Sequence, residues 1–348
     1  MTEEKKFSGD WLGRELSFRT GKLAKQADAS VLVQYGETVV MATVVQSKNE
    51  RDGIDFFPLM VEFEEKLYAA GIIKGSRWIK REGRPTDQSI LTGRMIDRSI
   101  RPLFNDEERK DVQLIITVLS VDGENDYDIV SLIAASAVLR ISGIDWNGPI
   151  GGIRVGLIDN QFVFNPSYEQ QGISNLDLIV AGTKEKVIMI EAGAQEIKED
   201  LMLEAIKLGQ EKLQGAINLI EQFKAQVTVK ESEETKKMIS EEEIKEKNRK
   251  EELLNFGKTW LKENIKNILF DKIYYTKNER KLAVRKIKEG LDEYLFTQNI
   301  GKSDRDFIIK KLVEKMVEAE VTRAILEEKK RVDGRSLNEI RSLSSEIA

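Results

Sequence analysis

The sequence contains neither cysteine nor histidine among its 348 residues. Without cysteine, the chain can form no disulfide, no thiolate zinc site and no cysteine nucleophile. Without histidine, it lacks the Ser-His-Asp triad, the histidine general base and the usual zinc ligand. Any chemistry on this chain therefore has to use carboxylates, hydroxyls, lysine, arginine and a bound ion or phosphate.

Long apolar runs are also missing. No stretch of about 18 apolar residues is present to span a bilayer, and the opening MTEEKKFSGDW lacks the apolar centre of a signal peptide. Charged residues make up 33% of the chain and hydrophobic residues 41%. We therefore expect a soluble, cytoplasmic protein without membrane contact, and the length predicts two or three domains.

Apolar patterning predicts strands in the front part of the chain. Residues 29–46 favour two strands joined at 35–37, residues 111–121 favour another strand, and residues 176–193 favour a second hairpin that turns at 183–186. Because hairpins predominate over regular βαβ units, the pattern disfavours a doubly wound nucleotide-binding fold. The prediction is an α+β domain.

Two helices are predicted among these strands. Asp128 is interpreted as the N-cap of a small-residue, apolar helix that ends at Gly143. Apolar side chains at helical spacing predict a longer helix over about 198–224.

The composition changes near residue 230. Residues 231–252 hold nine acidic and six basic side chains, a density typical of a solvated polar helix or linker. Helical periodicity continues behind them without a strand signal, so we expect an all-helical domain over 231–326. In the last segment, 327–348, Gly-Arg-Ser-Leu at 334–337 echoes Gly-Arg-Glu-Leu at 13–16, although four residues alone are weak support for a repeat.

Residues 74–104 are strongly basic, with eight basic and three acidic side chains in a chain of net charge −5. Pro85 and Thr86 predict a helix start at which Asp87 favours the positive end of the helix dipole.

Two groups of basic residues lie in this stretch. On the predicted helix, the spacing of Arg94, Arg98 and Arg101 places them on one face, where they either form ion pairs with carboxylates or bind anions. Upstream, four basic residues surround Trp78; they are Arg77, Lys80, Arg81 and Arg84. Cationic groups interleaved with an aromatic ring suit single-stranded nucleic acid, with charge for the phosphates and a flat face for a base. The alternative for Trp78 is a place in the core.

Four sequence blocks carry a resemblance to a known family. FFPL (56–59), EEKLYAAG (64–71), KREGRP (80–85) and IDR followed by IRPLF (96–104) occur in this order. Together with 125–156 and 187–211, they resemble the first RNase PH-like core of bacterial polynucleotide phosphorylases, an α+β fold of the ribosomal protein S5 domain 2-like type. The ending KKRVDGRSLNEIRSLSSE is similar to the opening of that family's second core. The resemblance implies a first core at 1–230, a helical linker domain at 231–326 and the start of a second core at 327–348.

The resemblance also implies an activity. The family consists of polyribonucleotide nucleotidyltransferases (EC 2.7.7.8), which degrade mRNA from the 3′ end with inorganic phosphate as co-substrate and release nucleoside diphosphates. Three chains form a ring around an RNA channel, and RNA degradosome proteins are further partners. The phosphate-binding and Mg²⁺-binding residues belong to the second core, so the resemblance implies no catalytic residue and no metal ligand in this chain and predicts that the chain alone is inactive.

The resemblance assigns roles to the basic residues. Lys80 and Arg81 match the basic pair of the family's channel loop, and Arg84, Arg94, Arg98 and Arg101 match arginines of its first core, where phosphate contacts are expected. The segment Arg77-Trp78-Ile79 departs from the two phenylalanines common in the family. Arg154 and Asp128 are weaker candidates, since an ion pair and a helix cap explain them. The alternative function is a non-catalytic RNA-binding ring subunit like those of exosomes.

Overall fold

The computed structural model describes residues 4–51, 53–54, 56–73, 83–227 and 241–347. The chain divides into two compact units, Met1–Ser232 and Glu233–Ala348. Within the described ranges, every helix is too short or too polar to cross a membrane.

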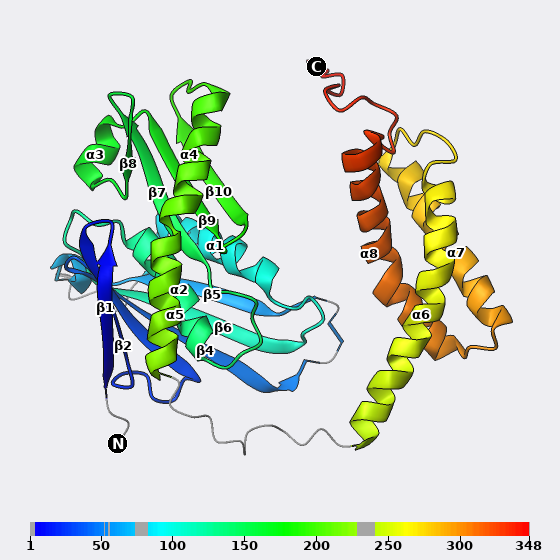
Figure 1. The fold of residues 1–348 in the computed structure, drawn as a ribbon, viewed down its shortest axis with the longest axis horizontal. Coiled ribbons are helices and arrows are strands. Elements are labelled where there is room, and N and C mark those ends of the chain that lie inside the picture. Colours follow the sequence, from blue (N-terminus) through cyan, green and yellow to red (C-terminus); the bar gives the residue numbers. More distant parts are fainter. Residues whose placement is uncertain (1–3, 52, 55, 74–82, 228–240, 348) are drawn as a thin grey trace. The chain divides into compact units, whose positions relative to one another are not determined.

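The first unit contains a six-stranded sheet (Figure 1). Its strands are β1 (Lys5–Trp11), β2 (Arg14–Thr20), β3 (Ala29–Tyr35), β4 (Thr38–Glu50), β5 (Leu59–Glu65) and β6 (Lys110–Ser120). They lie in the order β1-β2-β3-β4-β6-β5, and all pairs are antiparallel except β5 with β6. The predicted hairpin over 29–46 and the predicted strand at 111–121 are confirmed.

A four-stranded antiparallel sheet completes the β-structure of this unit. Its strands are β7 (Gly151–Ile158), β8 (Gln161–Phe164), β9 (Leu176–Gly182) and β10 (Val187–Ala194), in the order β10-β9-β7-β8. The second predicted hairpin is confirmed, and its turn is closed by the Thr183 amide, which donates to the Lys186 carbonyl at 2.9 Å. Two largely antiparallel sheets confirm the α+β prediction and exclude a doubly wound fold.

In the part of this unit that the structure describes, five α-helices and two 3₁₀ turns pack on these sheets. They are η1 (Leu67–Ala70), α1 (Asp87–Ile100), η2 (Arg101–Leu103), α2 (Tyr127–Ile141), α3 (Tyr168–Ile173), α4 (Glu199–Lys212) and α5 (Gln214–Val227). Helix α2 is buried on nearly every side, because it contacts β3 and β4 of the larger sheet as well as β7 and α5 (Figure 1). Its alanines and serines let these elements approach closely, while Leu132, Ile133 and Val138 fill the core.

The single long helix predicted over 198–224 is wrong, since α4 and α5 are separate helices that meet at Leu213. The indole Nε1 of Trp11 donates to the Lys212 carbonyl at 3.2 Å and takes an acceptor that a continuous helix would use internally. A Cβ on Gly215 would lie 2.7 Å from Trp11 Cδ1, so glycine makes room for the ring. The interruption therefore depends on a residue about 200 positions away.

The second unit is helical. It comprises α6 (Glu241–Leu269), α7 (Lys277–Thr297) and α8 (Lys302–Glu328), and its described residues contain no strand. The helices share a core of apolar side chains that includes Leu261, Ile287, Leu291 and Val313. The predicted helical periodicity is thereby confirmed, and the polar helix predicted within 231–252 is observed from residue 241 onward.

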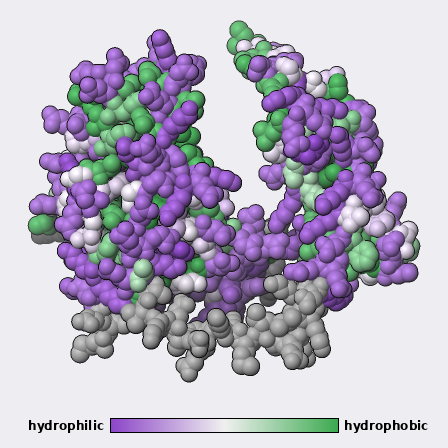
Figure 2. All heavy atoms as spheres, in the orientation of Figure 1, coloured by the Kyte–Doolittle hydropathy of each residue, from purple (hydrophilic) through white to green (hydrophobic). Residues whose placement is uncertain are grey.

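The chain beyond α8 is irregular. Lys329 has φ 55° and ends the helix in the left-handed region, and the Val332 carbonyl accepts a hydrogen bond from the Tyr274 amide at 3.1 Å. Figure 2 shows hydrophobic side chains at the C-terminal end of the chain, where Leu343 and Ile347 are almost fully exposed. That this segment opens a second core stays a prediction.

Candidate nucleic-acid interface

Helix α1 begins where the sequence predicts. Thr86 is the N-cap, and its hydroxyl accepts a hydrogen bond from the Ser89 amide at 3.0 Å while donating to Glu65 Oε2 at 2.8 Å. Asp87 lies in the first turn, where the helix dipole favours a negative charge. The cap therefore ties the start of α1 to strand β5.

Half of the predicted RNA contacts fall outside the described residues. Arg77, Trp78, Lys80 and Arg81 belong to this group, and their roles stay predictions. Arg84 is described: it is exposed, has no partner among the described residues, and lines a cavity of about 240 Å³ together with side chains of β5 and Thr86.

The arginines after Thr86 differ in how they are paired. Arg98 forms an ion pair with Glu191 of β10 at 2.9 Å. Arg101 caps the end of α1, pairs with Asp97 at 2.6 Å, and donates to the Leu59 carbonyl at 3.0 Å. The predicted ion-pair alternative is therefore confirmed for these two arginines.

Arg94 is the exposed arginine of α1 that has no partner in the described part of the chain. It lines a cavity of about 550 Å³ between α1 and β5, the free edge of the larger sheet, which is also lined by Arg101 and by three acidic residues, Glu62, Glu64 and Asp97. Met60 and Ile90, each about half exposed, lie on the same cavity. A guanidinium beside apolar surface can bind a phosphate and at the same time contact the face of a base. Arg84 and Arg94 are thus the predicted site residues whose charge is available in the described structure.

Arg154 is buried and paired, as its interpretation as a structural ion pair predicts. Its guanidinium reaches Asp126 from Nε at 2.5 Å, Asp177 from Nη1 at 2.5 Å and Asp128 from Nη2 at 3.6 Å. Three carboxylates thus surround one cation, and they come from the start of α2 and from β9. We call Arg154, Asp126, Asp128 and Asp177 the Arg154 cluster.

The prediction that Asp128 caps α2 is wrong. The cap is Asp126, which has extended backbone angles and accepts a hydrogen bond from the Asp128 amide at 2.9 Å. Asp128 lies within the first turn, where Thr92 Oγ1 of α1 donates to its carboxylate at 2.9 Å. Burial, followed by the charge of Asp126, raises the pKa of Asp128 to about 7.

The Arg154 cluster borders a cavity of about 250 Å³ that is unsuited to phosphate. Three acidic residues line it, Asp128, Asp177 and Glu191, against the single cation of Arg154. Mg²⁺ does not fit either, because the cluster carboxylates already surround Arg154, and the described residues hold no group of three acidic side chains arranged to bind a metal.

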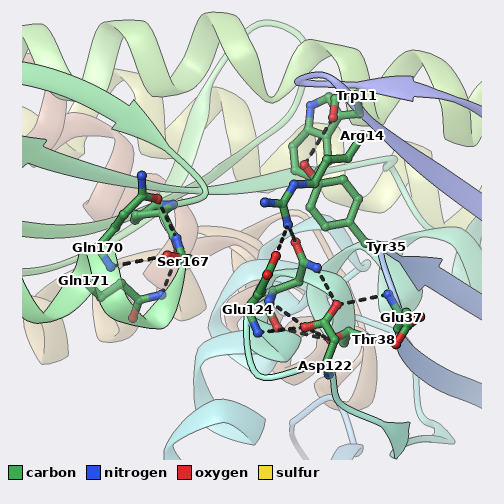
Figure 3. Close-up of polar contacts among 12 residues, drawn as sticks. Trp11, Arg14, Tyr35, Glu37, Thr38, Asp122, Glu124, Ser167, Gln170 and Gln171 are labelled. Atoms are coloured by element: carbon green, nitrogen blue, oxygen red, sulfur yellow. Dashed lines mark hydrogen bonds and ion pairs between the residues drawn. The ribbon is translucent and has the colours of Figure 1, made fainter.

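A polar network that the sequence analysis did not identify holds the loop before α2 (Figure 3). Asp122 accepts hydrogen bonds from the amides of Asn125 at 2.8 Å, Glu124 at 2.9 Å and Glu37 at 3.0 Å. Although burial opposes the shift, these bonds hold the pKa of Asp122 far below its usual value. Arg14 of β2 donates to the Asn125 side chain and pairs with Glu124 at 3.6 Å. In the sequence, the Asp-Gly pair at 122–123 is typical of a turn, and it is the feature from which this network could have been predicted.

Comparison with known families covers most of the chain. Residues 13–145 match the 3′ exoribonuclease family, domain 1, and residues 148–212 match domain 2 of the same family. Residues 252–336 match the polyribonucleotide nucleotidyltransferase, RNA binding domain. The three matches follow one another along one chain.

Curated relatives agree with these matches. The polyribonucleotide nucleotidyltransferase of Desulforamulus reducens is 43% identical over 96% of this chain and 44% of its own length. That of Bacillus subtilis is 41% identical over 100% of this chain and 47% of its own length. The chain thus spans somewhat under half the length of the curated relatives it matches. The crystal structure of rice Rrp46 matches 65% of this chain and 95% of its own chain, with a TM-score of 0.47 and 13% sequence identity. This likeness is too low to add to the assignment.

Proposed function

Because this chain belongs to the 3′ exoribonuclease family, in its polyribonucleotide nucleotidyltransferase branch, we propose that it is part of an enzyme that shortens RNA from the 3′ end by phosphorolysis. The observation that carries the proposal is the succession of the three family matches over residues 13–336. The activity is proposed for the whole protein, since the chain covers 44% of the relative from Desulforamulus reducens.

The proposed reaction transfers a nucleotidyl group to inorganic phosphate. An oxygen of phosphate attacks the phosphorus of the terminal phosphodiester, and the bond between that phosphorus and the 3′ oxygen breaks. The shortened RNA leaves with a 3′ hydroxyl that takes up a proton from phosphate, and the terminal residue leaves as a nucleoside diphosphate. Because phosphate is itself the nucleophile, the absence of histidine and cysteine from this chain is compatible with the reaction.

Within this enzyme we assign residues 1–230 to the first RNase PH-like core, 231–326 to the helical linker and 327–348 to the start of the second core. This chain supplies RNA contacts, and the Arg154 cluster takes no part in the chemistry, because its guanidinium is already paired with three carboxylates.

We further propose that three copies form a ring in the cytoplasm and that RNA passes along Arg84, Arg94 and the basic residues of 74–82. RNA degradosome proteins are proposed partners of the whole protein. Arg84 and Arg94 support this path because both are exposed without partners among the described residues. Arg98 and Arg101 contribute to the proposed RNA path indirectly. Their ion pairs with Glu191 and Asp97 hold α1, which carries Arg94, in place.

Salt-dependent RNA binding tests the proposed contacts. The affinity of the 348-residue chain for a single-stranded oligonucleotide is measured between about 50 and 200 mM salt, for the parent and for Lys80→Ala/Arg81→Ala. If both residues contact phosphates, the magnitude of the slope of log K against log salt decreases by about 1.4, at about 0.7 for each contact.

The matched control is Lys22→Ala/Lys25→Ala, which removes the same charge from exposed positions of the same unit. An unchanged slope in the Lys80/Arg81 variant, or an equal decrease in the control, contradicts the proposed path.

A non-catalytic RNA-binding subunit is the second candidate. Release of nucleoside diphosphates by the whole protein separates the two candidates, since a binding subunit releases none.

A further inference from the structure

We propose that the helical unit carries a binding site for a small organic anion, a monocarboxylate whose apolar body has the size of one ring or a short branched chain. The site is a cavity of about 220 Å³ where α6 ends, α7 begins and the second half of α8 lies (Figure 1). We call it the helical-unit cavity. The inference goes beyond the proposed function, because it concerns a small molecule and depends neither on RNA binding nor on phosphorolysis.

Four segments of the chain form the walls of the helical-unit cavity. Leu269 is the last residue of α6, and Ala283 and Val284 lie in the second turn of α7 beside Arg280. The lining is completed by α8 and the segment after it, with Val317, Val321, Ile325, Arg331, Val332 and Asp333. Walls on several sides suit a small molecule, whereas a docked helix or strand needs an elongated groove.

The segment after α8 is a fixed wall of this cavity. The Tyr274 amide donates to the Val332 carbonyl at 3.1 Å, and the Gly334 amide donates to the Arg331 carbonyl at 3.0 Å. The ammonium group of Lys330 lies 4.9 Å from the centre of the Phe270 ring. A ligand in the cavity therefore contacts the start of α7 and this segment together, and it stabilises the position of the chain that leaves α8.

The floor of the cavity is aliphatic. Apart from Arg280, Arg331 and Asp333, all of its described lining residues are alanine, valine, leucine or isoleucine. A nucleobase has polar edges that need hydrogen-bond partners when they are buried, and it binds best against an aromatic ring. This lining offers neither, so the body of the ligand is apolar rather than a base.

The charged residues of the cavity favour an anion. Arg280 Nε donates to the Thr276 carbonyl at 3.4 Å, and its guanidinium has no carboxylate partner among the described residues. Asp333 is shared by Arg331 at 3.3 Å and Arg335 at 2.7 Å, and hydrogen bonds from Arg335 lower its pKa to about 2. The carboxylate is therefore ionised at neutral pH and already engaged, whereas Arg280 is available to bind a ligand carboxylate through two hydrogen bonds.

The size and charge of the cavity restrict the ligand. Pockets for drug-sized ligands measure about 300–1,000 Å³, so the helical-unit cavity suits a smaller molecule. Its lining carries two cations and one anion, which leaves one positive charge for the ligand to balance. A second carboxylate would have to enter the aliphatic part without a partner, which is unfavourable. Phenylacetate and 3-methylbutanoate have the required combination of one carboxylate and one compact apolar body.

The test measures binding of phenylacetate and of 3-methylbutanoate to the whole 348-residue chain by titration calorimetry. For phenylacetate we expect one site per chain with a Kd of about 1 mM or lower. Phenylacetamide has the same body without the charge, and acetate has the charge without the body. Both are expected to bind about tenfold more weakly or not at all.

Two variants place the ligand in the cavity. Arg280→Gln removes the cation and is expected to weaken phenylacetate binding about tenfold or more. Its matched control is Arg285→Gln, which makes the same change on an exposed arginine of α7 outside the cavity lining. Val321→Phe fills the cavity without a change of charge and is expected to abolish binding, with urea unfolding to verify that the variant is folded. If Val321→Phe does not fold, Arg280→Gln decides.

Hydrogen exchange locates the site independently of any variant. Phenylacetate is expected to slow exchange of the Tyr274 and Gly334 amides, whose hydrogen bonds hold the segment after α8. The Thr183 amide, in a turn of the first unit, is expected to exchange at an unchanged rate.

The outcomes decide the inference without reference to RNA. Binding that is weakened in Arg280→Gln but not in Arg285→Gln supports the site. Failure of both monocarboxylates to bind the parent overturns it, and so does equal binding of phenylacetamide or an equal loss in the control. Displacement of phenylacetate by an equal concentration of AMP also overturns it, since the cavity would then bind nucleotides. None of these results bears on phosphorolysis, so the proposed function is tested separately.

Discussion

Replacing Asp128 with asparagine tests the electrostatics of the Arg154 cluster. The Asp128 carboxylate is buried, accepts a hydrogen bond from Thr92 at 2.9 Å and lies 3.6 Å from the Arg154 guanidinium. Burial and the neighbouring Asp126 raise its pKa to about 7. Asparagine keeps the size of the side chain and an oxygen for Thr92 but carries no charge, so it imitates the protonated acid.

The sign of the effect follows from proton uptake. Between about pH 4 and pH 7 the folded chain retains a proton on Asp128 that the unfolded chain has lost, so the free energy of unfolding decreases as the pH rises through this window. A difference of about three pKa units at about 1.4 kcal/mol each sets an upper limit of about 4 kcal/mol. Because asparagine does not titrate, Asp128→Asn removes this decrease in the free energy of unfolding. We expect the variant to be more stable than the parent at pH 8 and nearly as stable as the parent at pH 4.

Urea unfolding at pH 4 and pH 8, followed by circular dichroism, measures the difference. Asp145→Asn is the control, because Asp145 is exposed on the loop after α2 and is expected to change neither midpoint. A parent and an Asp128→Asn variant with the same pH dependence, or a variant less stable than the parent at pH 8, would show that Asp128 is not the group that titrates.

Three further changes have defined outcomes. Arg154→Met leaves the cluster carboxylates without their cation and is expected to cost about 3–5 kcal/mol at pH 8 and less at pH 5, whereas equal costs at both pH values contradict the ion-pair account. Gly215→Ala places a Cβ 2.7 Å from Trp11 Cδ1 and should destabilise by about 1–3 kcal/mol in urea unfolding; the control Gly172→Ala, with no atom within 4 Å of its Cβ, should not. Thr86→Ala removes the cap of α1 and should cost about 1 kcal/mol, and Thr86→Ser should restore most of it; no loss in the alanine variant argues against the cap.

The features that sequence predicted correctly depend on local chemistry. Gly36 has φ 63° in the turn between β3 and β4, which glycine adopts readily. Thr86 caps α1 because its hydroxyl reaches an amide three residues ahead. In both cases the residues that decide the structure are neighbours in the chain, so a short window contains the necessary information.

The features that sequence missed depend on distant partners. The break between α4 and α5 requires the indole of Trp11, which strand β1 brings to Lys212. The position of Asp128 inside α2 depends on Asp126, which is an equally good cap by residue type, and on Arg154 from β7. The same limit applies to the candidate site, since only the fold shows that Glu191 neutralises Arg98, whereas Arg94 has no partner among the described residues.

The measurement that tests the central claim most directly is the product released from single-stranded RNA by the whole protein, with and without inorganic phosphate. We predict nucleoside diphosphates that accumulate only when phosphate is present, and slower release by the Arg84→Glu/Arg94→Glu variant because its RNA contacts are reversed in charge. Release of nucleoside monophosphates without phosphate, or no release under either condition, would contradict the assignment to a phosphorolytic exoribonuclease.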